Sequence, residues 1–481
     1  MDPFNSLPPE VRLQVLISLP SKFSLSSIIR ASPTMLQQYL ERRTHIRQSL
    51  IANDLDEEMM QDALAIIQFL PTRGVPSINI RVVRRHLQRW LDKDFVSPLT
   101  NADDSLMQSL DKLHSMLLYF IQDYCSKALS SYMPREYLCL QGVQSPSPTA
   151  ELVFRLIPIT ASFNPDNLTK MELERFLKAF LLYELNCKVA KILGTSPNPA
   201  NPSNNLPRRS IKPSENEAIH CVHTYVRSLY GACIAQREDG FLPSGPDGSE
   251  FEAPLVFPDN FCFDPDIYTG DRGLRGNYHG DATSHLAKLG LETIAGFTGY
   301  GFRLSGENKL FDEHFGALLN SPLYRMGPYQ HAITRVDPSD DAGSLMYHNL
   351  FARLSRSNTT QLQIYQQRAW VFFDNDRLYL PRISARPRFP SENLLFQEAD
   401  RPVDLIAGVT GNTELLRSRI RSQKWQDEYA IKKQVLALDN ENYELQEENF
   451  YLRGEIETLR QTISENSESS LTLFEDQGGS Q

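Results

Sequence analysis

Residues 169–194 read TKMELERFLKAFLLYELNCKVAKILG. Thr169 and Glu172 have the spacing of a capping box, in which each side chain satisfies an unpaired amide at the start of a helix. Gly194 is typical of a helix end. Between them, apolar residues recur at helical intervals: Leu173, Phe176, Leu177, Phe180, Leu185, Val189 and Ile192. This stretch predicts one long helix, and similar patterns elsewhere predict a mainly α fold.

Two segments follow this helix along the chain. Residues 195–213 are rich in Pro, Asn and Ser, a composition that predicts a linker or surface loop. Ser214 and Glu217 repeat the capping-box spacing, so a second long helix is expected there. Residues 214–410 as a whole predict a helical and irregular domain with long loops, for which the pattern indicates no role.

The later part of that domain gives a weaker signal. Residues 285–294 and 361–373 are expected to be helical from their apolar spacing. Residues 370–380 could instead form a hairpin around Asp374-Asn375-Asp376, because short Asp- and Asn-rich segments favour tight turns.

On the N-terminal side, residues 46–194 predict a helical domain with several apolar-striped helices. We expect residues 1–236 to be nearly all helix, with residues 196–213 irregular. A β-sheet within residues 1–236 is therefore not expected.

Residues 1–45 predict three short helices, each with one apolar face. Pro8 and Pro9 fit a first helical turn, where amide protons have no partner. Pro20 ends the first helix, and Ser32-Pro33 has the pattern of an N-cap followed by proline at the first helical position. A unit this small has little core of its own, so it requires a partner or the rest of the chain.

This opening resembles the F-box. The residues that carry the resemblance are Leu7-Pro8, Glu10, Val15-Leu16, Leu19-Pro20, Leu25 and Ile28-Ile29. The chain departs from the family pattern where Ser32-Pro33 and Leu36 stand in the neighbourhood of its usual cysteine and tryptophan. The stretch from Ile29 to Pro33, and the segment from Gln366 to Asp374, are similar to segments of F-box-like proteins of filamentous fungi.

The resemblance implies an interaction protein. Through the box it would join a Skp-type adaptor of a cullin–RING ubiquitin ligase, and the rest of the chain would recruit an unknown substrate protein. The residues implied in binding are Leu7, Pro8, Val11, Val15, Leu16, Leu19, Leu25, Ile28 and Ile29. Such an apolar surface can enter a partner's helical groove. The alternative is that the same side chains pack on the protein's own helices.

Residues 411–463 predict a long helix with a heptad repeat. Leucine occupies every d position, at Leu438, Leu445, Leu452 and Leu459. The a positions are Val435, Asn442, Asn449, Ile456 and Ile463. The pattern favours a coiled coil, including a parallel homodimer, over a helix folded back on its own domain. The acidic residues 464–481 are expected to be a disordered tail.

A DNA-binding leucine zipper is an alternative for this region. Basic residues do precede the heptads: Arg417, Arg419, Arg421, Lys424, Lys432 and Lys433. However, Trp425, Asp427, Glu428 and Tyr429 interrupt them, whereas a basic region requires a continuous basic helix. The sequence therefore argues against nucleic acid as a partner.

Composition sets broader limits. The chain has 481 residues, a net charge of −10 and six scattered cysteines without a CxxC pair. No segment approaches the roughly 20 apolar residues that span a bilayer, and the first residues lack the pattern of a signal peptide. The cysteines fit reduced thiols, so a cytoplasmic or nuclear protein without a membrane segment is expected.

No pattern predicts a catalytic site, cofactor or metal. His220, Cys221, His223 and Cys233 lack the paired spacing of a zinc site. Asp264, Asp266 and Asp271 lack the other positions of a calcium loop. Gly296, Gly299 and Gly301 fit a tight turn among aromatic residues better than a phosphate loop. The basic run Arg81, Arg84, Arg85 and Arg89 fits a solvated helix face better than an anion site. We therefore do not expect an enzyme.

Overall fold

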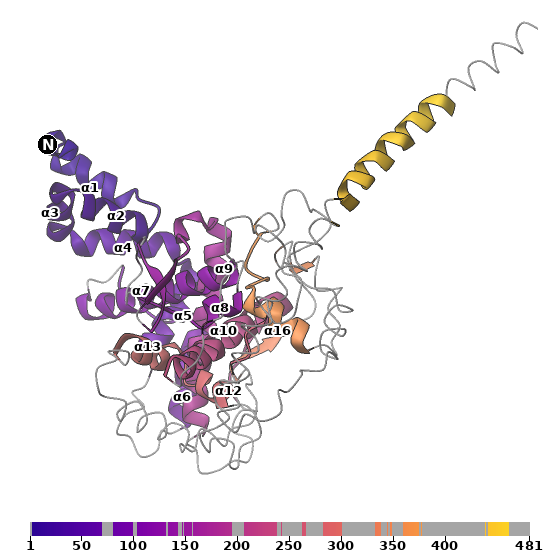
Figure 1. The fold of residues 1–481 in the computed structure, drawn as a ribbon. Helices are drawn as coiled ribbons and strands as arrows, with labels where there is room; N and C mark the ends of the chain where they lie inside the picture. Colours follow the sequence, from indigo (N-terminus) through magenta and orange to yellow (C-terminus); the bar gives the residue numbers. More distant parts are fainter. Residues whose placement is uncertain are drawn as a thin grey trace, which may run out of the picture. The chain divides into compact units, whose positions relative to one another are not determined.

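The structure is a computed structural model (Figure 1). It describes residues 2–69, 80–99, 103–194 with short gaps, 206–237, 262–265, 282–300, 332–337, 359–374 and 441–460, together with a few single residues. Within these ranges the chain is mostly helical, which confirms the mainly α fold class.

The first elements form a group of short helices at the N-terminal end (Figure 1). They are η1 (Pro3–Ser6), α1 (Pro9–Ile17), α2 (Lys22–Ala31), α3 (Pro33–Glu41) and α4 (Arg43–Asp54). As predicted, Ser32 caps α3: its Oγ accepts a hydrogen bond of 3.0 Å from the amide of Met35, and Pro33 occupies the first helical position. A hydrophobic core separate from that of the body joins these helices.

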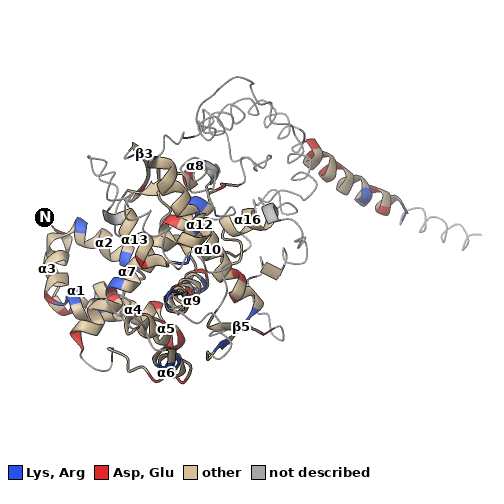
Figure 2. Ribbon diagram, turned by 90° about the horizontal axis from the view of Figure 1, so that it is seen from below, with Lys and Arg blue, Asp and Glu red and all other residues tan. Residues whose placement is uncertain are grey.

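The body contains the longer helices. They are α5 (Glu57–Ile67), α6 (Ile80–Leu91), α7 (Asp104–Ala128), α8 (Met133–Tyr137), η2 (Pro165–Asn167), α9 (Lys170–Gly194), α10 (Pro213–Arg237), α12 (Ala282–Ala287), α13 (Leu291–Tyr300) and α16 (Thr359–Gln367). α9 packs against α5 and α10, and Figure 2, which views α9 close to end-on, places it between them. α10 also contacts α12, α13 and α16, so one large core joins residues distant in sequence.

The two expected capping boxes differ. That of α9 is confirmed: the Thr169 amide donates to Glu172 Oε2 at 2.9 Å, and the Glu172 amide donates to Thr169 Oγ1 at 3.2 Å. That of α10 is wrong, because Pro213 is the first helical residue and the cap is Lys212, two residues before Ser214. Glu215, not Glu217, then reaches back to the cap, where its carboxylate accepts from the Lys212 amide at 2.9 Å.

The expectation that residues 1–236 contain no sheet is wrong. β1 (Leu140–Gln141), β2 (Glu151–Phe154) and β3 (Ile157–Ala161) form an antiparallel sheet in that order. The β2 and β3 segments are rich in β-branched and aromatic residues, which suit a half-buried strand. Arg155, with a φ of 49°, lies directly after β2, at the start of the tight connection to β3.

The expected linker at residues 195–213 is also partly structured. Within it, β4 (Arg209–Ile211) pairs in parallel with β5 (Thr334–Val336), and Ile211 is buried in the main core. Residues 195–205 lie outside the described residues. The sequence does not reveal this pairing, because the partner strand lies more than a hundred residues further along the chain.

The expected helices in the later domain are present but shorter. Gly290, with a φ of 78°, separates α12 from α13, so residues 285–294 are not one helix. α16 ends at Gln367, and residues 368–373 continue as turns rather than as a strand of a hairpin. Gly296 lies inside α13, so the expected tight turn at this glycine is wrong.

The segment from Gln366 to Asp374 packs into the body, with residues 367–373 buried. The hydroxyls of Tyr124 and Tyr137 donate to the backbone carbonyls of Gln366 and Gln367, the second at 2.7 Å. The ring of Phe372 stacks on Phe176 with a centroid separation of 4.1 Å. This segment therefore ties α7, α8 and α9 to one another.

Residues 441–460 form a helix that belongs to a second compact unit. Leu438, one turn before it, is also helical. Within the described residues, no helix combines the length and apolar composition needed to cross a bilayer.

Candidate functional site

The nine residues that the F-box resemblance implies in binding fall into three groups by their burial in the N-terminal helices. Leu16 and Leu25 are buried in the unit's own core, together with Met35, Ile46 and Leu50. Val15, Leu19, Ile28 and Ile29 are half-buried and pack around that core, and Leu7 is also half-buried. Pro8 and Val11 are exposed. The apolar stripe therefore serves the unit's own packing first, as in the alternative considered from the sequence.

Three large apolar side chains of this unit remain at its surface. Val11 of α1 is 43% exposed, and Leu36 and Leu40 of α3 are 39% and 62% exposed. α1 packs against α3, so these positions lie on adjoining helices. We call Val11, Leu36 and Leu40 the apolar surface of the N-terminal unit. Leu36 and Leu40 were not among the residues assigned to the box, although their spacing of four residues places them on one helix face.

Asp2, the N-cap of η1, ties η1 to the start of α3. Asp2 accepts hydrogen bonds from the Phe4 amide at 3.0 Å, the Ser32 hydroxyl at 2.6 Å and the Thr34 amide at 3.2 Å. These donors, with that of Ser32 contributing most, lower the pKa of Asp2 to about 2. The stabilisation that they give is present above the ordinary aspartate pKa and is lost as the pH falls through 2.

The unit meets the body through apolar side chains, a charged seam and further hydrogen bonds. Phe23 of α2 and Ile51 of α4 are buried in the main core. Beside them, Asp111 of α7 accepts from Lys22 and pairs with Arg47, both at 2.7 Å. Asp111 therefore holds a lysine of α2 and an arginine of α4 at once. On the far side of α2, the hydroxyl of Ser24 donates to Asp166 at 2.8 Å.

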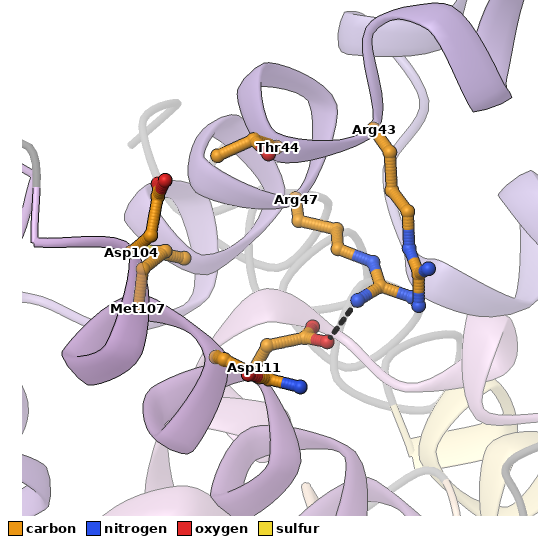
Figure 3. Close-up of a pocket in the computed structure, with 7 residues that line it drawn as sticks. Arg43, Thr44, Arg47, Asp104, Met107 and Asp111 are labelled. Atoms are coloured by element: carbon orange, nitrogen blue, oxygen red, sulfur yellow. Dashed lines mark ion pairs between the residues drawn. The ribbon is translucent and has the colours of Figure 1, made fainter.

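A cleft of about 230 Å³ opens along this seam (Figure 3). Arg43, Thr44 and Arg47 of α4 line one side, and Asp104, Met107, Gln108 and Asp111 of α7 line the other. Figure 3 shows Arg47 directed across the cleft onto Asp111. The carboxylate of Asp111 is thus engaged by cations on both oxygens, an arrangement that suits structural support better than proton transfer.

A second buried pair lies behind the seam. His114 of α7 is fully buried, with Nε2 at 2.9 Å from Oδ2 of Asp54. Burial, the largest influence, lowers the pKa of His114, and the nearby Lys22 lowers it further. Burial likewise lowers the pKa of Lys22, although Asp111 opposes this. The seam consequently depends on several ionisable groups removed from water.

Three of the residues considered for a zinc site, Cys221, His223 and Cys233, are buried. Cys221 and Cys233 are buried, and burial raises the pKa of both thiols. His223 is buried against Ser284, with 3.5 Å between Nε2 and Oγ, and burial lowers the pKa of His223 to about 3. The described residues contain no cluster of three or more potential metal ligands.

The remaining sequence candidates fall partly outside the described residues. Asp266, Asp271 and Gly301 do so, as does the basic stretch before the heptads. On α6, Arg81, Arg84, Arg85 and Arg89 are exposed, while Val83, Leu87 and Trp90 of the same helix are buried. Arg89 pairs with Asp94 at 3.5 Å.

Most of the heptad residues lie on the helix of residues 441–460. Asn442, Leu445, Asn449, Leu452, Ile456 and Leu459 lie on residues 441–460 and are exposed. Leu438 is helical and exposed, and Val435 and Ile463 lie outside the described residues.

Comparison with known protein families, with curated proteins and with solved structures finds no match for this chain.

Proposed function

We propose that the chain is an interaction protein whose N-terminal unit binds a Skp-type adaptor of a cullin–RING ubiquitin ligase. The observation that carries the proposal is the organisation of α1–α4. These helices close around their own small core, separate from the main core, and leave Val11, Leu36 and Leu40 at the surface. The sequence resemblance to the F-box lies in the same helices.

The physical basis is the burial of exposed apolar surface. A side chain such as leucine gains roughly 1.5–3 kcal/mol when it moves from full exposure to full burial. Val11, Leu36 and Leu40 are 39–62% exposed, so a helical groove on a partner can cover a substantial part of each. The helical body would then recruit a substrate protein, and the charged seam at Asp111 would fix the angle between the two parts.

Binding of the full-length chain to a purified Skp-type adaptor tests the proposal. The double variant Leu36→Asp and Leu40→Asp should weaken binding at least about tenfold, because charges would enter an apolar interface. Both side chains are exposed, so the variant should keep its fold, which urea unfolding can verify. Leu16 is unsuitable for this test because it is fully buried in the unit's own core.

The matched control is Val82→Asp on α6. Val82 is 41% exposed, a fraction similar to the 39% of Leu36, but it lies on a helix of the body. This variant should bind as the wild type does. A wild-type chain that does not bind the adaptor, or a control that loses binding equally, would contradict the proposal.

A further inference from the structure

The helix of residues 441–460 carries an exposed apolar stripe. Leu445, Leu452 and Leu459 at d, and Ile456 at a, are each between 46% and 62% exposed. The three leucines repeat every seven positions, and Ile456 fills an a position between them, the pattern of a two-stranded left-handed coiled coil. Isolated helices of this length are marginal in water, so the stripe needs a covering surface.

We infer that residues 441–460 form a parallel two-stranded coiled coil with the same helix of a second copy of this chain. The inference goes beyond the adaptor role and does not depend on it. It would give the protein two N-terminal units per assembly.

The flanking charges identify the partner and its direction. Glu441, Glu448 and Glu455 occupy the g positions, and Arg453 and Arg460 occupy e positions; acidic residues recur along this helix (Figure 2). In a parallel pair, g faces e of the other helix, so Glu448 meets Arg453 and Glu455 meets Arg460 of the second copy. In an antiparallel pair, g faces g, which would place glutamates opposite one another.

The asparagines at a positions favour the same direction. In a parallel pair, Asn442 and Asn449 each face their own counterpart, and the two amides can bond to each other. In an antiparallel pair, a faces d, so the amides would be buried against leucine. In the single helix, Asn449 Nδ2 already donates to the Leu445 carbonyl at 2.9 Å, which leaves its Oδ1 well suited to accept from the second copy.

The existing contacts of these side chains would not prevent pairing. Arg460 lies 3.9 Å from Glu457 on its own helix, and both side chains are 75% exposed. Such exposed pairs contribute little, so Arg460 can turn to the second copy. Twenty described residues make about 30 Å of helix, which predicts a modest association in the micromolar range.

Sedimentation velocity of the full-length chain tests self-association. The wild type should be dimeric at about 50 μM, and Leu445→Ala with Leu452→Ala should weaken association about a hundredfold. Both leucines are exposed in the single chain, so the body should remain folded in this variant. A monomeric wild type, or a dimer that the two alanines leave unchanged, would overturn the inference.

A charge-exchanged chain tests the direction. It carries Glu448→Arg, Glu455→Arg, Arg453→Glu and Arg460→Glu, so its own parallel g–e pairs remain attractive. This chain should dimerise with itself but should not mix with a differently tagged wild type, because glutamate would then face glutamate and arginine would face arginine. Preferential mixing of the two chains would overturn the parallel arrangement, since it is the result that g–g pairing gives.

Discussion

Glu217 of α10 illustrates how a single side chain can carry a tertiary role that its local sequence does not reveal. Its spacing from Ser214 suggested a helix cap, yet its Oε1 accepts from Gln366 Nε2 at 3.1 Å and from Trp370 Nε1 at 3.3 Å. These partners lie some 150 residues away, so local pattern could not identify them. Burial raises the pKa of Glu217 to about 7, despite the opposing hydrogen bonds.

The raised pKa predicts a pH-dependent stability. The folded state holds the Glu217 proton up to about pH 7, whereas the unfolded chain releases it near 4.5. Stability is therefore undiminished below pH 4.5, falls by at most about 3 kcal/mol between pH 4.5 and 7, and is constant once the folded state has also lost the proton. Glu217→Gln should remove this fall. The free energy of unfolding of the variant, relative to that of the wild type, should therefore increase between pH 5 and 8. Urea unfolding at several pH values measures it, and a difference constant with pH would contradict the prediction.

Arg368 gives a second prediction for a single residue. It is fully buried, and its Nη1 donates to the carbonyls of Ala128 at 2.9 Å and Ser130 at 2.6 Å, at the C-terminal end of α7. Arg368→Met should lower the free energy of unfolding by about 3 kcal/mol, because these carbonyls lose charged donors. Arg84→Met, on the exposed face of α6, should change it by less than about 0.5 kcal/mol. Equal effects of the two substitutions in urea unfolding would refute this assignment.

Among the helices and strands, features set by neighbouring residues could be predicted from the sequence, whereas pairing between distant segments could not. The cap at Thr169, the N-cap at Ser32 and the long α9 follow from spacing within a few residues, so the sequence identifies them. The pairing of β4 with β5 depends on chain segments far apart, which periodicity cannot detect. The sequence shows the apolar stripe of the box. It does not show that Leu16 faces inward while Val11 faces outward. Both residues fit the same stripe, and only packing separates them.

The charged seam between α2, α4 and α7 should contribute to the stability of the folded chain. Asp111→Asn should lower the free energy of unfolding by about 3 kcal/mol, because Lys22 and Arg47 would lose their shared carboxylate in a mostly buried place. Asp94→Asn is the control, since its pairing with Arg89 is exposed and should contribute less than about 1 kcal/mol. Urea unfolding measures both. A seam variant no less stable than the control would show that apolar contacts alone fix the N-terminal unit.

Gly454 provides a prediction for the heptad helix. It lies at an f position, and a Cβ added there would meet no atom within 4 Å. Gly454→Ala should stabilise the helix by about 1 kcal/mol per chain, because glycine loses more backbone freedom on folding. If two chains pair, the dissociation constant should fall at least about tenfold in sedimentation equilibrium. If Gly454→Ala increased helicity by circular dichroism but left association unchanged, formation of this helix would not be coupled to pairing.

At the scale of the whole molecule, the chain combines parts with different physical roles. One large core joins α5–α10 with the segment from Gln366 to Asp374, and a smaller core holds α1–α4. The heptad helix lies in a second compact unit. Composition and periodicity predicted the helical class and the heptads, because both are local properties. They did not predict that residues 367–373 would be buried, since that depends on contacts with α7, α8 and α9.

We propose that the N-terminal unit is a binding surface for a Skp-type adaptor. Hydrogen–deuterium exchange of the full-length chain, with and without the purified adaptor, tests it most directly. Exchange should become slower on binding in α1 and α3, which carry Val11, Leu36 and Leu40, and should be unchanged in α6. No change in exchange at saturating adaptor, or protection confined to helices of the body, would contradict adaptor binding by the N-terminal unit.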